Sequence, residues 1–120
     1  MLKKIAVILT TLLVLGVAAA GAQDNRTVFW QRWDVVIDQV DTTDNRFRVT
    51  EIYDMEFGGR FSFGSAVIPT DRLNGISNVQ VTQDGQQLRE GCSQQAGTYC
   101  VRQSSDELSI EYYFLSPINN

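Results

Sequence analysis

Apolar and polar residues alternate along two successive segments of the chain, residues 33–40 and 47–57. The side chains of a β-strand point to opposite faces in turn, so this period of two predicts two strands with one buried face each. The polar residues 41–45 predict the turn of a β-hairpin between them. The second segment shows the pattern most clearly, with an apolar face of Phe47, Val49, Tyr53, Met55 and Phe57 and a polar face of Arg48, Thr50, Asp54 and Glu56.

Shorter strands are predicted along the rest of the chain. Gly58 and Gly59 interrupt the alternation, and Phe61 and Phe63 resume it. Strands that recur about every ten residues, without a helical period after residue 22, predict an all-β fold. We expect an antiparallel β-sandwich, immunoglobulin-like or jelly-roll-like, after an N-terminal signal helix. The remaining predicted features are an irregular connection at residues 68–75, strands at 79–81, 99–101 and 108–114, a tight turn at Asp84-Gly85, and a return strand from Leu88.

Residues 1–22 have the features of a secretory signal peptide. A basic start with two lysines precedes the apolar residues 5–17, and small residues follow where a signal peptidase requires them. Cleavage is expected between Ala22 and Gln23. The alternative is an uncleaved membrane anchor, because the apolar run continues through Ala22.

Composition restricts the chemistry of the exported part, residues 23–120. These 98 residues suffice for one small domain, and they carry eight arginines against 14 acidic residues, a net charge of −6. Such a surface does not neutralise phosphates, so a nucleic-acid partner is excluded. The chain has no histidine, which excludes a Ser/His/Asp triad, a Cys/His nucleophile and a mixed Cys/His zinc site. We expect no cofactor, no metal site and no catalytic residue.

Cys92 and Cys100 are the two cysteines of the chain. Both follow the signal segment, and exported proteins form disulfides, so we expect a bond between them. The bond would join a hairpin between the strand near Leu88 and the strand at residues 99–101. A redox-active pair is the weaker alternative because the spacing is not Cys-x-x-Cys, and a metal site would lack further ligands.

Glu51 is in phase with Val49 and Tyr53, on the face that should turn inward. A buried carboxylate needs a partner, and Arg60 is the first candidate for a structural ion pair. The alternative is a glycosidase acid/base pair with Asp54 or Glu56. Both of those side chains point to the opposite face of the strand, which favours the structural interpretation.

Three large aromatic residues, Phe29, Trp30 and Trp33, lie close together in the sequence. Aromatic rings at such positions could stack on a sugar or on a protein partner. In a small sandwich they belong more often to the core, which is the interpretation that we prefer.

Several short segments, taken together, resemble a known family. From Trp33 to Tyr113 the chain is similar to the bacterial predicted-membrane-protein family called domain of unknown function 2207 (DUF2207). The resemblance implies an extracytoplasmic β domain, followed in family members by membrane helices, with no known activity. It rests on residues 33–37 and 47–51, Gly59-Arg60-Phe61 leading to Ile68-Pro69, residues 79–81 with Asp84-Gly85, and residues 110–112, the most specific part being Val49-Thr50-Glu51 followed by the arginine segment and Ile-Pro.

The chain departs from the family pattern in two ways. Many members have histidine-arginine-glycine where Gly58-Gly59-Arg60 stands, and no membrane helix follows Phe114. We therefore expect a domain that is cut before its final strands, with residues 108–114 leaving an unpaired edge unless this strand lies centrally in the sheet. Residues 23–120 alone are then expected to be marginally stable or self-associating.

These observations favour a non-enzymatic extracytoplasmic domain of a bacterial membrane-anchored protein. We expect it to be an interaction or structural module of the cell envelope, held to the membrane by the signal segment or by a missing downstream helix. The alternative is a free secreted module that binds a glycan or a protein. A hydrolase that uses Glu51 is the third hypothesis.

Overall fold

The structure, a computed structural model, describes residues 25–119. The predicted all-β class is confirmed for this part of the chain. The predicted signal peptide and its cleavage point between Ala22 and Gln23 lie outside the described residues. In chain order the strands are β1 (Thr27–Asp41), β2 (Arg46–Gly58), β3 (Arg60–Pro69), β4 (Thr82–Gln83), β5 (Gln86–Gln87), β6 (Arg89–Glu90), β7 (Thr98–Gln103) and β8 (Glu107–Asn119).

Strands β1 and β2 form a long antiparallel hairpin, as the alternating pattern predicts. The polar turn is held by its own side chains, because Asp41 Oδ1 accepts hydrogen bonds from the N–H groups of Thr43 and Asp44 at 2.9 and 3.2 Å. Asn45 then takes a positive φ of 53°, which asparagine tolerates better than most residues. The hairpin begins at Thr27, earlier than the sequence pattern indicates.

Two irregularities divide β1 into shorter regular stretches. Its register with β2 shifts between Trp30 and Arg32 and again between Asp38 and Asp41. A bulge adds one unpaired residue to its strand. Because of the first shift, Trp30 and Trp33 lie on the same face, although an odd number of positions separates them in the sequence. Between the two shifts, every residue from Arg32 to Asp38 has a partner in β2.

The second sheet has four strands in the order β3-β8-β7-β6. Strand β8 lies in its interior, paired antiparallel with β3 on one side and with β7 on the other. Of the two positions considered for residues 108–114, the central one is therefore correct, and the strand leaves no unpaired edge. The sequence pattern shows where this strand lies but not that β3, much earlier in the chain, supplies its second neighbour.

Strand β6 pairs with β7 in parallel, so the predicted hairpin at this point is also wrong. Residues 91–97 connect the two strands, far fewer than the dozen or more residues of an ordinary parallel crossover. The short loop is closed by the Cys92–Cys100 disulfide, across a Cα–Cα distance of 4.7 Å. The predicted disulfide is thus present, and it fixes a parallel connection rather than a hairpin.

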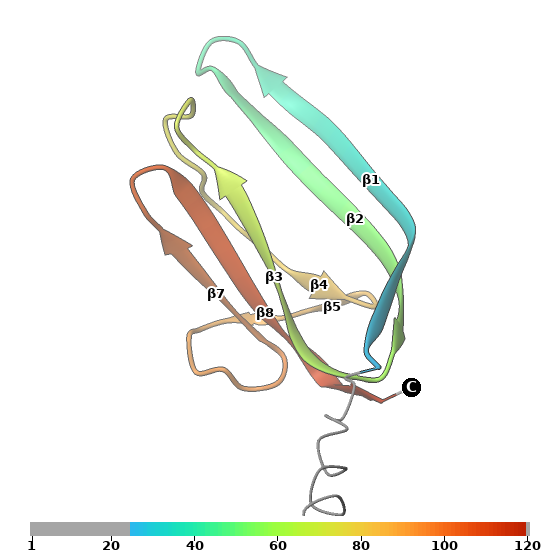
Figure 1. The fold of residues 1–120 in the computed structure, drawn as a ribbon. Helices are drawn as coiled ribbons and strands as arrows, with labels where there is room; N and C mark the ends of the chain where they lie inside the picture. The colour runs from blue at the N-terminus through green and yellow to red at the C-terminus, as the bar shows by residue number, and fades with distance from the viewer. Residues whose placement is uncertain (1–24, 120) are drawn as a thin grey trace, which may run out of the picture.

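The chain passes from one sheet to the other through a single residue. Strand β2 ends at Gly58 and β3 begins at Arg60, and Gly59 between them has a φ of 94° that favours glycine. Next to this corner, the ring of Phe57 packs against Phe61 and Phe114, with centroids 5.0 and 5.5 Å apart. Figure 1 shows the hairpin rising from this corner and β3 rising beside it, while β8 runs antiparallel to β3 and ends near the corner.

The core lies on the four-stranded sheet. Its buried apolar residues are Leu88, Tyr99, Cys100, Leu108 and Phe114. The segment 76–81 contains no strand, contrary to the prediction for residues 79–81. It is held by side-chain and turn contacts instead: the Tyr99 hydroxyl donates to the Val79 carbonyl at 2.8 Å, and the Leu88 N–H donates to the Val81 carbonyl at 2.8 Å.

Removing the disulfide should loosen the β6–β7 connection. The double variant Cys92→Ala/Cys100→Ala is expected to lose about 2–3 kcal/mol of unfolding free energy, because the short closed loop gains entropy in the unfolded chain. Urea unfolding measures this loss. Alkylation of the unreduced parent should add no mass, and labelling of both thiols in the native protein would refute the bond.

We expect residue 64 to require glycine because of the ring of Tyr112, its direct partner across β3 and β8. A Cβ at Gly64 would lie 2.6 Å from atoms of the Tyr112 ring, whereas one at Gly91 would meet nothing within 4 Å. Gly64→Ala should therefore lower the unfolding free energy by about 1–3 kcal/mol, and Gly91→Ala should leave it nearly unchanged. Equal midpoints in urea for the two variants would contradict this packing.

Candidate functional site

The most distinctive surface of the molecule is one face of the β1–β2 hairpin. Residues that pair directly across an antiparallel sheet share a face, so Trp33 lies with Tyr53, and Ile37 with Val49. We call this surface the apolar face. Its large side chains are between 47 and 64% exposed, and they are Trp30, Trp33, Val35, Ile37, Phe47 and Val49.

The opposite surface, the charged face, carries ion pairs. Arg48 donates two hydrogen bonds to the Asp38 carboxylate, both of 2.8 Å, and Arg32 lies 2.7 Å from Asp34. The bond from Arg48 holds the pKa of Asp38 below its usual range, and the same bond raises the pKa of Arg48. Such exposed pairs add little stability, but they mark this side of the hairpin as the one adapted to water.

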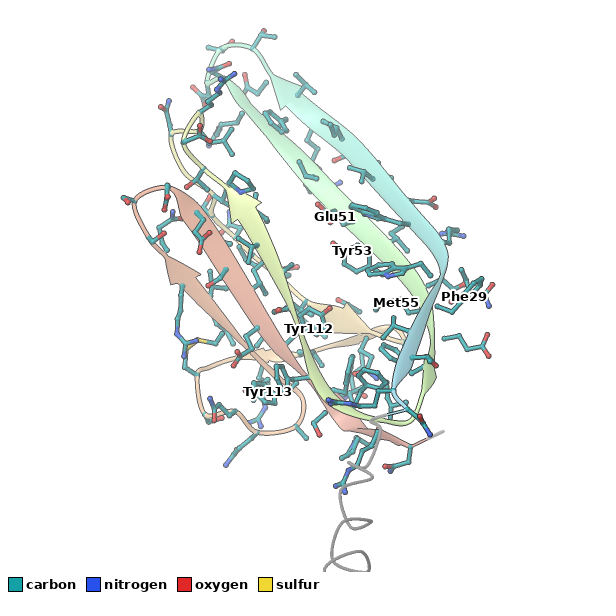
Figure 2. The ribbon with its side chains drawn as sticks, viewed as in Figure 1. Phe29, Glu51, Tyr53, Met55, Tyr112 and Tyr113 are labelled. Carbon is teal, nitrogen blue, oxygen red and sulfur yellow. A yellow bond between two sulfur atoms is a disulfide. The ribbon has the colours of Figure 1, made fainter. Side chains whose placement is uncertain are left out.

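The three predicted aromatic residues do not belong to the core. Phe29, Trp30 and Trp33 are 64, 52 and 64% exposed, so the preferred core interpretation is wrong. Phe29 pairs with Glu56 on the charged face, and Figure 2 shows it pointing away from the rest of the molecule. Trp30 and Trp33 lie together on the apolar face, with ring centroids 6.1 Å apart.

Tyr53 completes an aromatic cluster with these two tryptophans. Its ring centroid lies 5.4 Å from that of Trp30, at an interplanar angle of 86°, and 6.1 Å from that of Trp33, at 57°. Edge-to-face contacts of this kind are favourable between aromatic rings. They also leave the three rings tilted against one another rather than aligned in one plane.

Glu51 lies on the apolar face, as its phase in the strand predicts, but it is exposed and has a different partner. It accepts a hydrogen bond from the Tyr53 hydroxyl. Arg60 begins β3 beyond the corner and pairs with Asn119, and no ion pair joins it to Glu51 among the described residues. Gly58 lies seven positions beyond Glu51 along the strand, on the order of 23 Å, so the proposed Glu51–Arg60 pair is wrong.

The carboxylates that could have formed a glycosidase pair lie apart. Glu51 pairs with Val35 on the apolar face, whereas Asp54 pairs with Arg32, and Glu56 with Phe29, on the charged face. This separation is the one that the strand period predicts. The hydrolase hypothesis therefore gains no paired acid and base from the geometry of β2.

All four tyrosines of the chain have a raised pKa. For Tyr53 the main cause is burial, followed by the hydrogen bond to Glu51, and burial is also the main cause for Tyr99 and Tyr112. For Tyr113 the main cause is its hydrogen bond to Glu111. Each of these environments opposes a phenolate, so the hydroxyls stay protonated at neutral pH.

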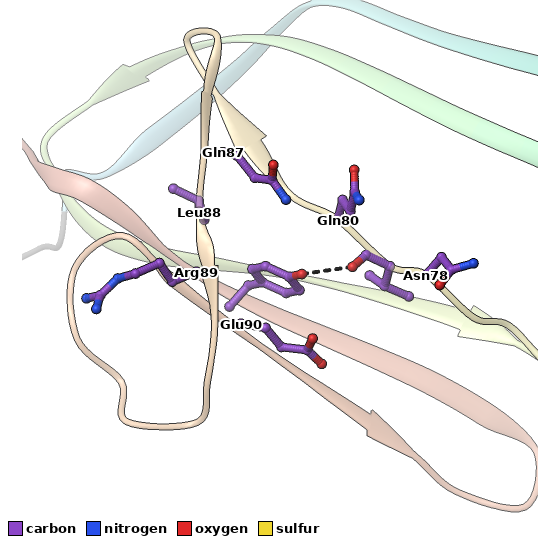
Figure 3. A pocket seen from close by; sticks show the side chains of 8 residues that line it. Asn78, Gln80, Gln87, Leu88, Arg89 and Glu90 are labelled. Atoms are coloured by element: carbon purple, nitrogen blue, oxygen red, sulfur yellow. Dashed lines mark hydrogen bonds between the residues drawn. The ribbon is translucent and has the colours of Figure 1, made fainter.

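A shallow groove lies beside the disulfide loop, between the segment 78–80 and the strands β5 and β6 (Figure 3). Its volume is about 620 Å³, and amide and charged side chains line much of it. Tyr99 also lines the groove, but it is 3% exposed, and its hydroxyl donates to the Val79 carbonyl. The groove thus lacks an exposed ring on which a sugar could stack, which makes it a weaker candidate site than the apolar face.

No protein-family model, no curated protein and no solved structure matches the chain. The similarity to DUF2207 therefore stays a prediction. Within residues 25–119, no helix has the length and hydropathy needed to span a membrane. The same residues contain no group of three or more acidic or cysteine side chains suited to a metal ion.

If the apolar face is a contact surface rather than a core, shortening its side chains should cost little stability. Ile37 is 60% exposed and Leu108 is 2% exposed. Ile37→Ala is expected to change the unfolding free energy by less than about 1 kcal/mol, whereas Leu108→Ala should lower it by about 2–5 kcal/mol. Comparable losses in urea unfolding would show that Ile37 is buried in solution.

The tyrosines are expected to titrate late. An unfolded phenol has a pKa near 10, and all four folded values are raised. The contribution of these tyrosines to the unfolding free energy is thus fully present below about pH 10, and it is lost as the pH rises through their pKa values in the folded protein. The ultraviolet absorbance of the phenolate should follow alkaline unfolding. Glu51→Gln should lower the pKa of Tyr53, and Glu56→Gln, on the other face, should not.

Proposed function

We propose that this chain is a non-enzymatic interaction module that works outside the cytoplasm, and that the apolar face of its hairpin binds a protein of the cell envelope. The observation that carries the proposal is the group of large apolar side chains exposed on one side of β1 and β2. Exposed apolar patches of this kind are typical of protein interaction sites.

The chemistry of the chain supports a place in an oxidising compartment. The Cys92–Cys100 bond leaves no free thiol among the described residues, and disulfides persist mainly in exported proteins. The basic and apolar N-terminal sequence agrees with export. The similarity to DUF2207 is in keeping with the same location, at the outer side of a bacterial membrane.

A protein suits the apolar face better than a glycan. Trp30, Trp33 and Tyr53 are tilted against one another by 40 to 86°, so they do not form one flat platform for several sugar units. The aliphatic residues Val35, Ile37 and Val49 extend the surface beyond the rings. Aromatic anchors surrounded by aliphatic side chains are characteristic of protein interfaces.

Photo-cross-linking in cells that make the protein naturally tests this proposal. A photoreactive residue at Val49, on the apolar face, should give a discrete cross-linked product with an envelope protein. The matched position is Thr50, the next residue of β2, which is also exposed but lies on the charged face. It should give little product.

The two positions also separate the alternatives. A glycan attached through Val49 would support a secreted glycan-binding module instead. Equal products from Val49 and Thr50, or none from Val49, would contradict a binding role for the apolar face.

A further inference from the structure

The outer edge of the hairpin is a second surface, distinct from the apolar face. The sheet of β1 and β2 has two strands only, so β1 has one row of backbone N–H and C=O groups without a strand partner among the described residues. Figure 1 shows β1 on the outer side of the molecule, with β2 between it and the other sheet. An unpaired strand edge is a template for another strand.

The regular part of this edge is self-complementary. It runs from Arg32 to Asp38, between the two register shifts, and its middle residue is Val35. If a second copy pairs antiparallel with Val35 opposite Val35, Arg32 meets Asp38 of the other copy at both ends. Trp33 then meets Ile37 of the other copy, so apolar side chains also come together.

The neighbouring registers are disfavoured by charge. A shift centred on Asp34 would place the two Asp34 carboxylates directly opposite each other. A shift centred on Val36 would place Asp34 opposite Asp38 twice. Like charges in directly opposed positions are destabilising. Sliding one strand by a single residue, so that Asp34 lies opposite Val35, would join the apolar face of one copy to the charged face of the other.

We infer that two copies of this chain associate through their β1 edges, around a two-fold axis at Val35. The product is a continuous four-stranded sheet in the order β2-β1-β1-β2. At each end, Arg32 of one copy approaches Asp38 of the other copy. That Asp38 already accepts hydrogen bonds from Arg48 of its own copy. Both apolar faces lie on the same side of the joined sheet. The inference goes beyond the proposed function, because it concerns the edge of the hairpin and leaves its apolar face free.

Disulfide trapping of the full exported chain tests the register. Opposed residues of antiparallel strands have Cα atoms about 4.5–5.5 Å apart, within the range of a disulfide. Under mild oxidation, Val35→Cys should form a covalent dimer. Val36→Cys alone should form none, because each Val36 lies opposite Asp34, and neither should Asp34→Cys alone. A mixture of Asp34→Cys and Val36→Cys should form a mixed covalent dimer.

Sedimentation equilibrium gives a second readout without new cysteines. The parent should show a concentration-dependent dimer, and Arg32→Glu should shift it to monomer because the introduced carboxylate would face Asp38. The matched control is Arg46→Glu, the same charge change at the exposed turn end of β2 and outside the pairing segment. It should leave the dimer intact.

Each remaining outcome overturns the inference. A monomeric parent at all concentrations refutes association, and equal trapping of Val35→Cys and Val36→Cys refutes the register. Failure of the Asp34→Cys and Val36→Cys mixture to cross-link refutes it independently of how Val35→Cys folds. A product from Val49 in cells together with a monomeric parent would leave the proposed function standing and remove only the dimer.

Discussion

The contact of Phe57 with Phe61 and Phe114 anchors the hairpin to the four-stranded sheet. It lies at the corner where Gly59 turns the chain from β2 into β3. Because Phe57 is in phase with Tyr53 and Met55 on β2, packing this ring against β8 also turns the rest of that face toward the second sheet. Figure 2 shows Glu51, Tyr53 and Met55 on this side of β2, and Phe29 on the other. The corner thus determines which face of the hairpin is turned toward the second sheet.

A two-stranded hairpin cannot bury its own side chains. Isolated hairpins are marginal in water, and a third strand or a packed layer is needed for independent stability. Near the corner, the aromatic contacts of Phe57 supply such a layer. Farther along, Val35 and Ile37 are 51 and 60% exposed, while burial is concentrated around Leu108 and Tyr99 on the other sheet. A substitution in the four-stranded sheet therefore affects a core, whereas one in the distal part of the hairpin affects a surface.

The sequence predicts local features of this fold well and long-range ones poorly. The alternation in residues 47–57 correctly assigns both faces of β2, because the period of two follows from strand geometry alone. The parallel β6–β7 pair could not be predicted, because two residues of β6 carry no pattern. The neighbours of β8 were missed for a different reason, since pairing between β3 and β8 depends on the path of the intervening chain.

The candidate site shows the same division. Phase correctly places Glu51 with Tyr53, and their spacing of two residues on one face was a signal for the hydrogen bond between them. Arg60 was a wrong partner because the turn at Gly59 sends it into another sheet. The exposure of Trp30 and Trp33 could not be inferred from composition. Whether an aromatic residue is core or surface depends on what covers its face, and a strand pattern contains no information about the covering layer.

The apolar face and the charged face of the hairpin differ in chemistry. A strand pair adapted to water on both faces would carry charges on both. Here Asp38, Arg48, Arg32 and Asp34 lie on one face and pair with one another, while the other face carries Glu51 among tryptophan and aliphatic side chains. The carboxylate of Glu51 is bound to Tyr53, so even this charge is held against a ring of the aromatic cluster. Such asymmetry is expected of a strand pair whose apolar side contacts another surface, and this argument supports a contact role for the apolar face.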